Sequence, residues 1–183
     1  AGCRHSLDQQ SLSRLKATLG PQDRLLLCDE PHDMALCSQA AKQAQGKILI
    51  FTESHCHPER NAISLAEEIL RAHPEWAGFS GRTLPITHNR LSVVEAEMYA
   101  AEIENGVQEH PWRTILDGFF LVQAEAYQAS GGFRAQLGHF AEWHLAARMH
   151  QQGHRIGFAP ELTFKHYYVG YAKELIDFSA DFA

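Results

Sequence analysis

Glu53, His55 and His57 are the first residues whose types and spacing could perform chemistry. They follow an apolar run, residues 47–52 (KILIFT), in the sequence TESHCHP. Alternate residues of an extended chain point the same way, so these side chains could converge on one cation. A carboxylate with imidazoles suits Mn²⁺ or another divalent transition metal better than Mg²⁺, which prefers oxygen ligands. The alternative is an ordinary polar loop after a strand.

Glu142 is the second candidate, and its chemistry would be that of a general base. The apolar residues Leu145, Ala146 and Met149 follow it at helical spacing. The carboxylate therefore begins the buried face of a helix predicted over residues 141–152. A carboxylate in the first helical turn is favoured by the helix dipole and stays ionised, which suits removal of a proton from a hydroxyl group. The alternative is a capping or dipole interaction.

Two further places could take part in binding. His166 lies in an aromatic, β-prone stretch (TFKHYY), and a single histidine there is more often packed than a ligand. Gly131 and Gly132, in the sequence SGGF, predict a turn with a permissive backbone. A backbone without side chains would also allow a sugar to approach closely.

Helical and strand patterns alternate along the chain and predict an α/β sheet that would position these residues. Helices are predicted over residues 11–19, 33–45, 61–72, 92–105 and 141–152, and strands over 24–28, 47–52, 115–122 and 155–159. The Pro- and Gly-rich stretch 73–85 is predicted to be irregular. This order is typical of parallel strands with crossover helices, where ligands bind beyond the C-terminal strand ends. The unbroken apolar run 47–52 further predicts a central strand.

The composition indicates one domain. A chain of 183 residues with 45% hydrophobic content can bury one core. The net charge of −6, with 16 basic and 22 acidic residues and no basic block, argues against a nucleic-acid partner. No apolar run reaches the roughly 18 residues of a transmembrane helix. The four cysteines form no C-x-x-C pair, which favours a reducing, cytoplasmic compartment.

The order of these motifs resembles the family 2 glycosyltransferases, which have the Rossmann-like nucleotide-sugar fold called GT-A. The segment AAKQAQGKILIFTESHCHP is similar to the family's helix, strand and D-x-D metal-binding region. GGF, followed by AEWHLAARMHQQGHRIGFAPE, is similar to its GGF and E-D-W-x-L-x-x-R-x-x-x-x-G stretch. FKHYY looks like the later strand with a metal-ligand histidine, and DGFFLVQAEAYQASGGF like the strand that enters the acceptor site.

The resemblance implies a partial catalytic domain over residues 1–183, with a mostly parallel central sheet flanked by helices. The family's first βαβ unit has no counterpart before Leu12, so the chain is either a fragment of a longer protein or a shortened descendant. Glu53-Ser54-His55 stands at the D-x-D position, and Ala141-Glu142 at the E-D pair. Glu142 is thus one methylene longer than the usual Asp.

The function implied by the resemblance is transfer of a sugar, with inversion, from a nucleoside-diphosphate sugar to a glycan or other hydroxyl acceptor. It would depend on a divalent metal, Mn²⁺ or Mg²⁺. The implied site residues are Glu142 as catalytic base, Glu53, His55 and His166 as metal ligands, and Gly131, Gly132 and Trp143 in substrate binding. The alternative is a non-catalytic domain of this fold that binds sugar, metal or a protein partner.

Overall fold

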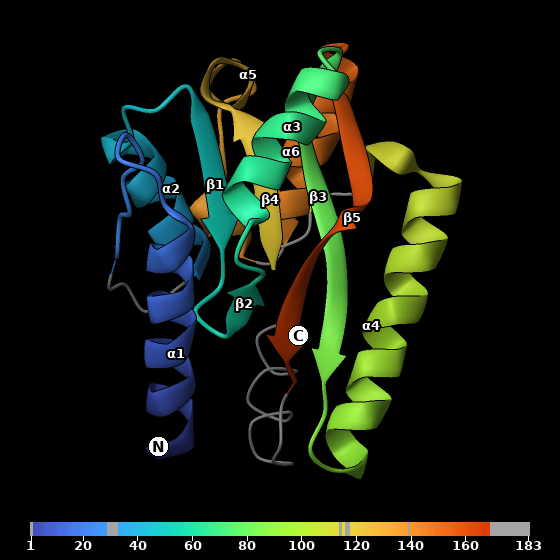
Figure 1. The fold of residues 1–183 in the computed structure, drawn as a ribbon. Helices are drawn as coiled ribbons and strands as arrows, with labels where there is room; N and C mark the ends of the chain where they lie inside the picture. Colours follow the sequence, from blue (N-terminus) through green and yellow to red (C-terminus); the bar gives the residue numbers. More distant parts are fainter. Residues whose placement is uncertain (1, 29–32, 114, 116–117, 139, 169–183) are drawn as a thin grey trace.

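The computed structural model describes residues 2–28, 33–113, 115, 118–138 and 140–168. In these ranges a five-stranded sheet is flanked by helices (Figure 1). The helices are α1 (Gly2–Thr18), α2 (Asp33–Gln43), α3 (Ala62–Ala72), α4 (Arg90–Glu109), α5 (Ala124–Ala129) and α6 (Phe140–Gln151), with 3₁₀ turns at Pro111–Arg113 and Ala135–Leu137. The strands are β1 (Ile48–Thr52), β2 (Cys56–Pro58), β3 (Trp76–Ile86), β4 (Phe119–Gln123) and β5 (Arg155–Tyr167).

The sheet has the strand order β1-β4-β3-β5-β2. β3 and β5 pair in parallel, whereas the pairs β1–β4, β3–β4 and β2–β5 are antiparallel. β1, β3 and β5 therefore run in one direction, and β4 and β2 run in the other. The predicted α/β class is confirmed. The pairing differs from a mostly parallel sheet because β4 lies between β1 and β3 with the opposite direction.

β1 was predicted to be central, and that prediction is wrong, because β1 ends the strand order among the described residues. The strand predicted over residues 24–28 is also wrong: this segment is irregular, and Leu27 is 67% exposed. A run of apolar residues favours an extended strand, but a sheet forms only where another backbone supplies hydrogen bonds. Within the part of the chain that the structure describes, β1 obtains them on one side only, from β4.

Both faces of the sheet are covered, which explains the continuous apolar character of β4. Phe120 and Val122 pack in one core with residues of α2 and α6. Phe119 and Leu121, pointing the opposite way, pack in a second core with residues of α3. Figure 1 shows α3 in front of the sheet and α6 behind it. The predicted buried face of α6 is confirmed, since Leu145, Ala146 and Met149 are fully buried.

β3 lies in the middle of the sheet, although residues 73–85 were predicted to be irregular; that prediction is wrong. Its glycines serve close packing of the backbone. A Cβ atom on Gly78 would lie 2.5 Å from the Leu121 carbonyl oxygen, and one on Gly81 would collide with the Leu162 carbonyl oxygen. Glycine in a strand can mark such a close approach as well as a turn, and local sequence does not distinguish the two.

β5 bends across the end of the sheet that carries the candidate site. Its pairing with β3 shifts register between Ala159 and Thr163, so the strand passes through Pro160, where it was predicted to end, in a bulge. β1 and β2 are at opposite ends of the strand order, yet only residues 53–55 join them. The bulge turns β5 toward this short connection, so its last residues pair with β2 (Figure 1).

In the described ranges, no helix is long and apolar enough to cross a membrane. No disulfide links Cys28, Cys37 and Cys56 to one another. The cytoplasmic location suggested by the cysteines stays a prediction.

Candidate metal centre

A tight turn after β1 positions the first group of functional side chains. The backbone N–H of Cys56 donates to the carbonyl oxygen of Glu53 at 3.1 Å, which closes the turn over residues 53–56. The Thr52 hydroxyl donates to the Gly118 carbonyl at 2.8 Å and fixes the end of β1. Glu53 and His55 therefore lie beyond the C-terminal end of β1, as predicted.

β5 brings His166 to this turn from the other end of the chain. His166 is the cross-strand partner of Cys56 in the β2–β5 pair, so both side chains lie on one face. His55 Nε2 and His166 Nε2 are 2.9 Å apart, and each lies 3.2 Å from Glu53 Oε2. The expected convergence of these three side chains is confirmed; their role as metal ligands stays a prediction.

Cys56 joins this cluster, whereas His57 does not. Cys56 Sγ lies 3.5 Å from Glu53 Oε2, and the donor atoms of Glu53, His55, Cys56 and His166 all lie within 4.8 Å of one another. His57 was expected to point with Glu53 and His55, but the turn breaks the two-residue alternation on which that expectation relied. His57 is instead buried, with its ring 4.8 Å from that of Tyr167.

The electrostatics of the cluster favour an ionised Glu53. Partial burial raises the pKa of the Glu53 carboxyl, but hydrogen bonds from His166 and His55, and their charge, outweigh burial and hold the pKa well below its ordinary value. The Tyr99 ring of α4 stacks parallel to the His166 ring at 5.9 Å, and Tyr168 meets that ring edge-on at 4.5 Å. These aromatic contacts hold the His166 ring in place.

The chemistry of the donor set fits a divalent transition metal. Two imidazole nitrogens, a carboxylate oxygen and a thiol are ligands that such ions accept. Ligand atoms about 2.0 to 2.1 Å from a tetrahedral ion are about 3.3 Å apart. The observed separations of 2.9 and 3.2 Å among the nitrogen and oxygen atoms need only small adjustments to reach that geometry. Mg²⁺ fits poorly because it prefers oxygen ligands throughout.

The predicted Gly131–Gly132 turn is present, and both residues have positive φ angles, 76° and 60°. The Tyr127 hydroxyl accepts a hydrogen bond from the Phe133 N–H at 3.0 Å and supports the turn from inside. Burial raises the pKa of Tyr127 to about 12, so the hydroxyl stays protonated. A Cβ atom on Gly131 would collide with the Arg148 guanidinium unless the arginine side chain moved. Contact of this turn with a substrate stays a prediction.

Glu142 and Trp143 lie in the first turn of α6, as predicted. Glu142 is half-buried, between the buried Ala141 and the exposed Trp143. The Trp143 side chain is 42% exposed, and the Arg113 guanidinium carbon lies 4.6 Å from its ring centroid. The catalytic role of Glu142 and the substrate contact of Trp143 stay predictions.

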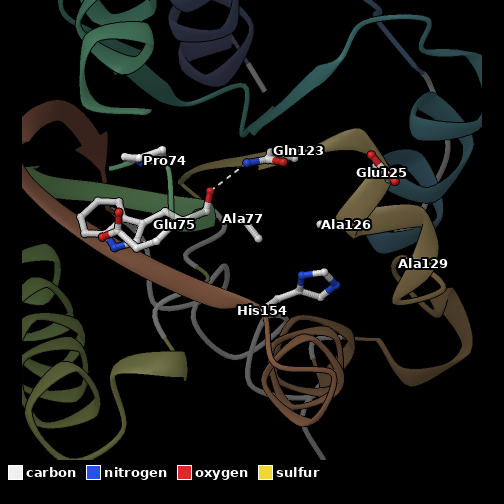
Figure 2. A pocket seen from close by; sticks show the side chains of 9 residues that line it. Pro74, Glu75, Ala77, Gln123, Glu125, Ala126, Ala129 and His154 are labelled. Carbon is white, nitrogen blue, oxygen red and sulfur yellow. Dashed lines mark hydrogen bonds between the residues drawn. The ribbon is translucent and has the colours of Figure 1, made fainter. Parts of the chain in front are cut away.

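A separate surface hollow of about 320 Å³ lies at the other end of the sheet (Figure 2). It is lined by residues at the starts of β3 and β5 and at the end of β4, among them Glu75 and His154. Gln123 Nε2 donates to the Trp76 carbonyl at 2.9 Å along its wall. β1, β3 and β5 run away from this hollow toward Glu53 and His166, so it is no part of the metal cluster.

No protein-family model matches the sequence, and no curated protein matches it. Solved structures do resemble the fold. The mannosyltransferase PcManGT from Pyrobaculum calidifontis, in complex with GDP-Man and Mn²⁺, matches at a TM-score of 0.64 and 15% identity, over 88% of this chain and 53% of that one. A mycobacterial protein matches at a TM-score of 0.55 and 15% identity, over 88% and 50%. The chain thus spans about half the length of these two, and it has the GT-A-like fold of the solved mannosyltransferase.

Proposed function

We propose that this protein is a family 2 type glycosyltransferase that moves a sugar from a nucleoside-diphosphate sugar to an acceptor hydroxyl, with inversion and with a bound divalent metal. The observation that carries the proposal is the convergence of Glu53, His55 and His166 beyond the end of β1. His166 is 113 residues from Glu53 in sequence, so the fold itself assembles this group of candidate ligands.

The fold supports the proposal. The solved mannosyltransferase that it resembles holds GDP-Man and Mn²⁺, a nucleotide sugar and a divalent ion. In α/β folds, ligands bind beyond the C-terminal ends of the strands, and the cluster of this chain lies at such an end. A cluster of side chains that could hold a metal ion therefore lies where a donor diphosphate would be expected.

In the proposed transfer reaction, different residues would bind the metal, accept the proton and bind the substrate. Glu53, His55 and His166 would hold the metal, which when bound neutralises negative charge on the diphosphate leaving group. The acceptor oxygen attacks the anomeric carbon as the bond from that carbon to the diphosphate oxygen breaks. The Glu142 carboxylate takes the proton of the acceptor hydroxyl. Attack on the face opposite the leaving group inverts the configuration, and Gly131, Gly132 and Trp143 would bind the substrate.

Calorimetry and a transfer assay test the proposal. The protein is titrated with a panel of nucleoside-diphosphate sugars, with Mn²⁺ and with a chelator, and sugar transfer to glycan acceptors is followed in parallel. We expect at least one donor to bind only when a divalent ion is present. Glu53→Gln should weaken that binding at least about tenfold, because the ion loses an anionic ligand. His73→Ala, in an exposed His–Glu pair at the other end of the sheet, is the control.

The outcomes separate the two candidate functions. Donor binding together with transfer supports the enzyme. Donor binding without transfer to any acceptor tested supports a non-catalytic GT-A-like domain that binds sugar or metal. Absence of donor binding with every metal and nucleotide sugar contradicts the proposal.

A further inference from the structure

Cys56 is the one member of the cluster that the proposed function does not use. Its side chain is only 1% exposed, and its Sγ lies 3.5 Å from Glu53 Oε2. An ordinary buried cysteine packs as a small apolar residue, and Cys56 does contact the apolar core beneath α3. Its sulfur, however, also faces the carboxylate that the two histidines share.

Backbone geometry explains why the sulfur is at this place. The turn over residues 53–56 puts Cys56 next to Glu53 and His55, and the β2–β5 register puts it opposite His166. Two independent features of the fold thus direct the thiol into the same cluster. β2 begins at Cys56, so strand pairing fixes the position of this residue as well as the turn does.

We propose that Cys56 is the fourth ligand of the metal site, and that the site takes Zn²⁺ in preference to Mn²⁺ or Mg²⁺. The proposal rests on the metal site of the proposed function and specifies its metal. Imidazole, carboxylate and thiolate groups each bind zinc in proteins, and four such ligands complete the tetrahedral coordination that zinc adopts. The sulfur bond to zinc is longer, about 2.3 Å, so a separation near 3.5 Å between sulfur and oxygen fits a shared ion.

The thiolate decides the choice of metal. Soft sulfur ligands favour zinc, whereas carboxylate and water oxygens favour Mg²⁺ and Mn²⁺, and Mn²⁺ is the weakest binder of the first-row divalent series at a site of this kind. A donor diphosphate would then have to bind as a fifth ligand, a coordination number that catalytic zinc sites sometimes reach.

Cobalt substitution tests the proposal directly on the wild-type protein, with no assay of activity. Co²⁺ bound by a thiolate gives an intense sulfur-to-metal charge-transfer band in the near ultraviolet. We expect this band in the wild type, its loss on addition of Zn²⁺, and its persistence with an excess of Mn²⁺ or Mg²⁺. Absence of the band, or displacement of Co²⁺ by Mn²⁺, would overturn the proposal.

Two substitutions sharpen the test. Cys56→Ser and Cys56→Ala should lose the band and bind Zn²⁺ at least about 100-fold more weakly, since loss of a ligand exceeds the 10- to 100-fold cost of losing an outer-shell partner. Cys37→Ser, at a half-buried thiol on α2, should behave as the wild type. Circular dichroism without metal shows whether each variant is folded. Equal zinc affinity in a folded Cys56→Ala protein would overturn the proposal.

Donor titration separates this inference from the proposed function. A charge-transfer band with no nucleotide-sugar binding would leave the zinc site established and the transferase proposal refuted. Donor binding with Mn²⁺ and no such band would leave the transferase proposal standing and refute Cys56 as a ligand.

Discussion

At the residue scale, the candidate site depends on one carboxylate that two imidazoles share. Glu53 Oε2 lies 3.2 Å from Nε2 of both His55 and His166. In the metal-free protein these contacts stabilise the ionised carboxylate. In the proposed metal complex the same atoms would be the ligands, and the metal-free structure already holds them close together.

The shifted pKa of Glu53 predicts a pH dependence of stability. The folded-state pKa of Glu53 lies below the ordinary 4.5. Near and below pH 4.5 the Glu53 carboxyl therefore binds fewer protons in the folded protein than in the unfolded chain. The contribution of Glu53 is therefore complete above pH 4.5 and is lost as the pH falls below it. Urea unfolding of the metal-free protein between about pH 5 and 3 should show a shallower fall in unfolding free energy for Glu53→Gln than for the wild type.

Glu68→Gln, on the exposed side of α3, is the control and should keep the wild-type slope. Identical slopes for the wild type and Glu53→Gln would contradict the electrostatic account of the cluster.

The role of Glu142 gives a second prediction at this scale. Gln cannot accept the proton of the acceptor hydroxyl, so Glu142→Gln should lower the transfer rate by about 10²- to 10⁴-fold. Donor binding and folding should be retained, because loss of a helix-dipole interaction costs about 1 kcal/mol or less. Steady-state kinetics measure the rate, and calorimetry measures donor binding.

Glu125→Gln is a matched control, because Glu125 is also an acidic residue in the first turn of a helix, the exposed start of α5. It should transfer at the wild-type rate. If Glu142→Gln also does so, Glu142 is not the base.

At the scale of elements, two glycines that follow α5, one before and one after the 3₁₀ turn Ala135–Leu137, show how packing adds to the cost of an unusual backbone conformation. Gly132 and Gly138 both have positive φ, 60° and 51°. A Cβ atom on Gly132 would lie 2.7 Å from the Tyr127 ring, whereas one on Gly138 meets no atom within 4 Å. Both positions have a positive φ, which L side chains rarely adopt, and they differ in packing.

Alanine at the two glycines should therefore have different effects. Gly138→Ala should cost about 1 to 3 kcal/mol, because the backbone at this position, with φ 51° and ψ −134°, is one that residues other than glycine rarely adopt. Gly132→Ala should cost about 1 to 3 kcal/mol beyond its own backbone strain, because the Tyr127 ring must also move. Chemical denaturation of both variants measures the difference. A loss for Gly132→Ala no larger than that for Gly138→Ala would contradict a costly contact with the Tyr127 ring.

At the scale of the whole molecule, the cluster connects parts of the chain that are distant in sequence. The turn after β1 and the end of β5 meet there, at one end of a sheet whose strand order places β1 and β2 farthest apart. A metal bound by both segments would tie these parts of the sheet together in the folded state only.

Metal binding should therefore raise the melting temperature. A metal at 100 times its dissociation constant adds about 2.7 kcal/mol to the unfolding free energy. We expect a chelator to lower the melting temperature of the wild type. The same treatment should leave His166→Ala unchanged, because that variant lacks the ligand supplied by β5. His73→Ala should retain the full response, since its exposed pair with Glu75 lies elsewhere. A metal-dependent shift that survives in His166→Ala would place the ion at another site.

The sequence by itself determined the elements with strong local patterns and most of the candidate cluster. Helical periodicity predicted α2, α3 and α6, and the apolar run predicted β1 with Glu53 and His55 beyond its end. These features depend on neighbouring residues, so they are readable along the chain. The motif resemblance also named His166, because the order of motifs retains information on spatial arrangement that periodicity lacks.

Only the tertiary structure decided which backbones pair and which side chains meet. Gly78 and Gly81 indicated an irregular segment, but close approach of neighbouring strands makes that segment the central β3. Residues 24–28 indicated a strand, but no described strand pairs with them. Cys56 belongs to the cluster and His57 does not, because of the turn over residues 53–56 and the β2–β5 register, which puts Cys56 opposite His166. Strand pairing depends on contacts between residues far apart in sequence, and a local pattern does not contain them.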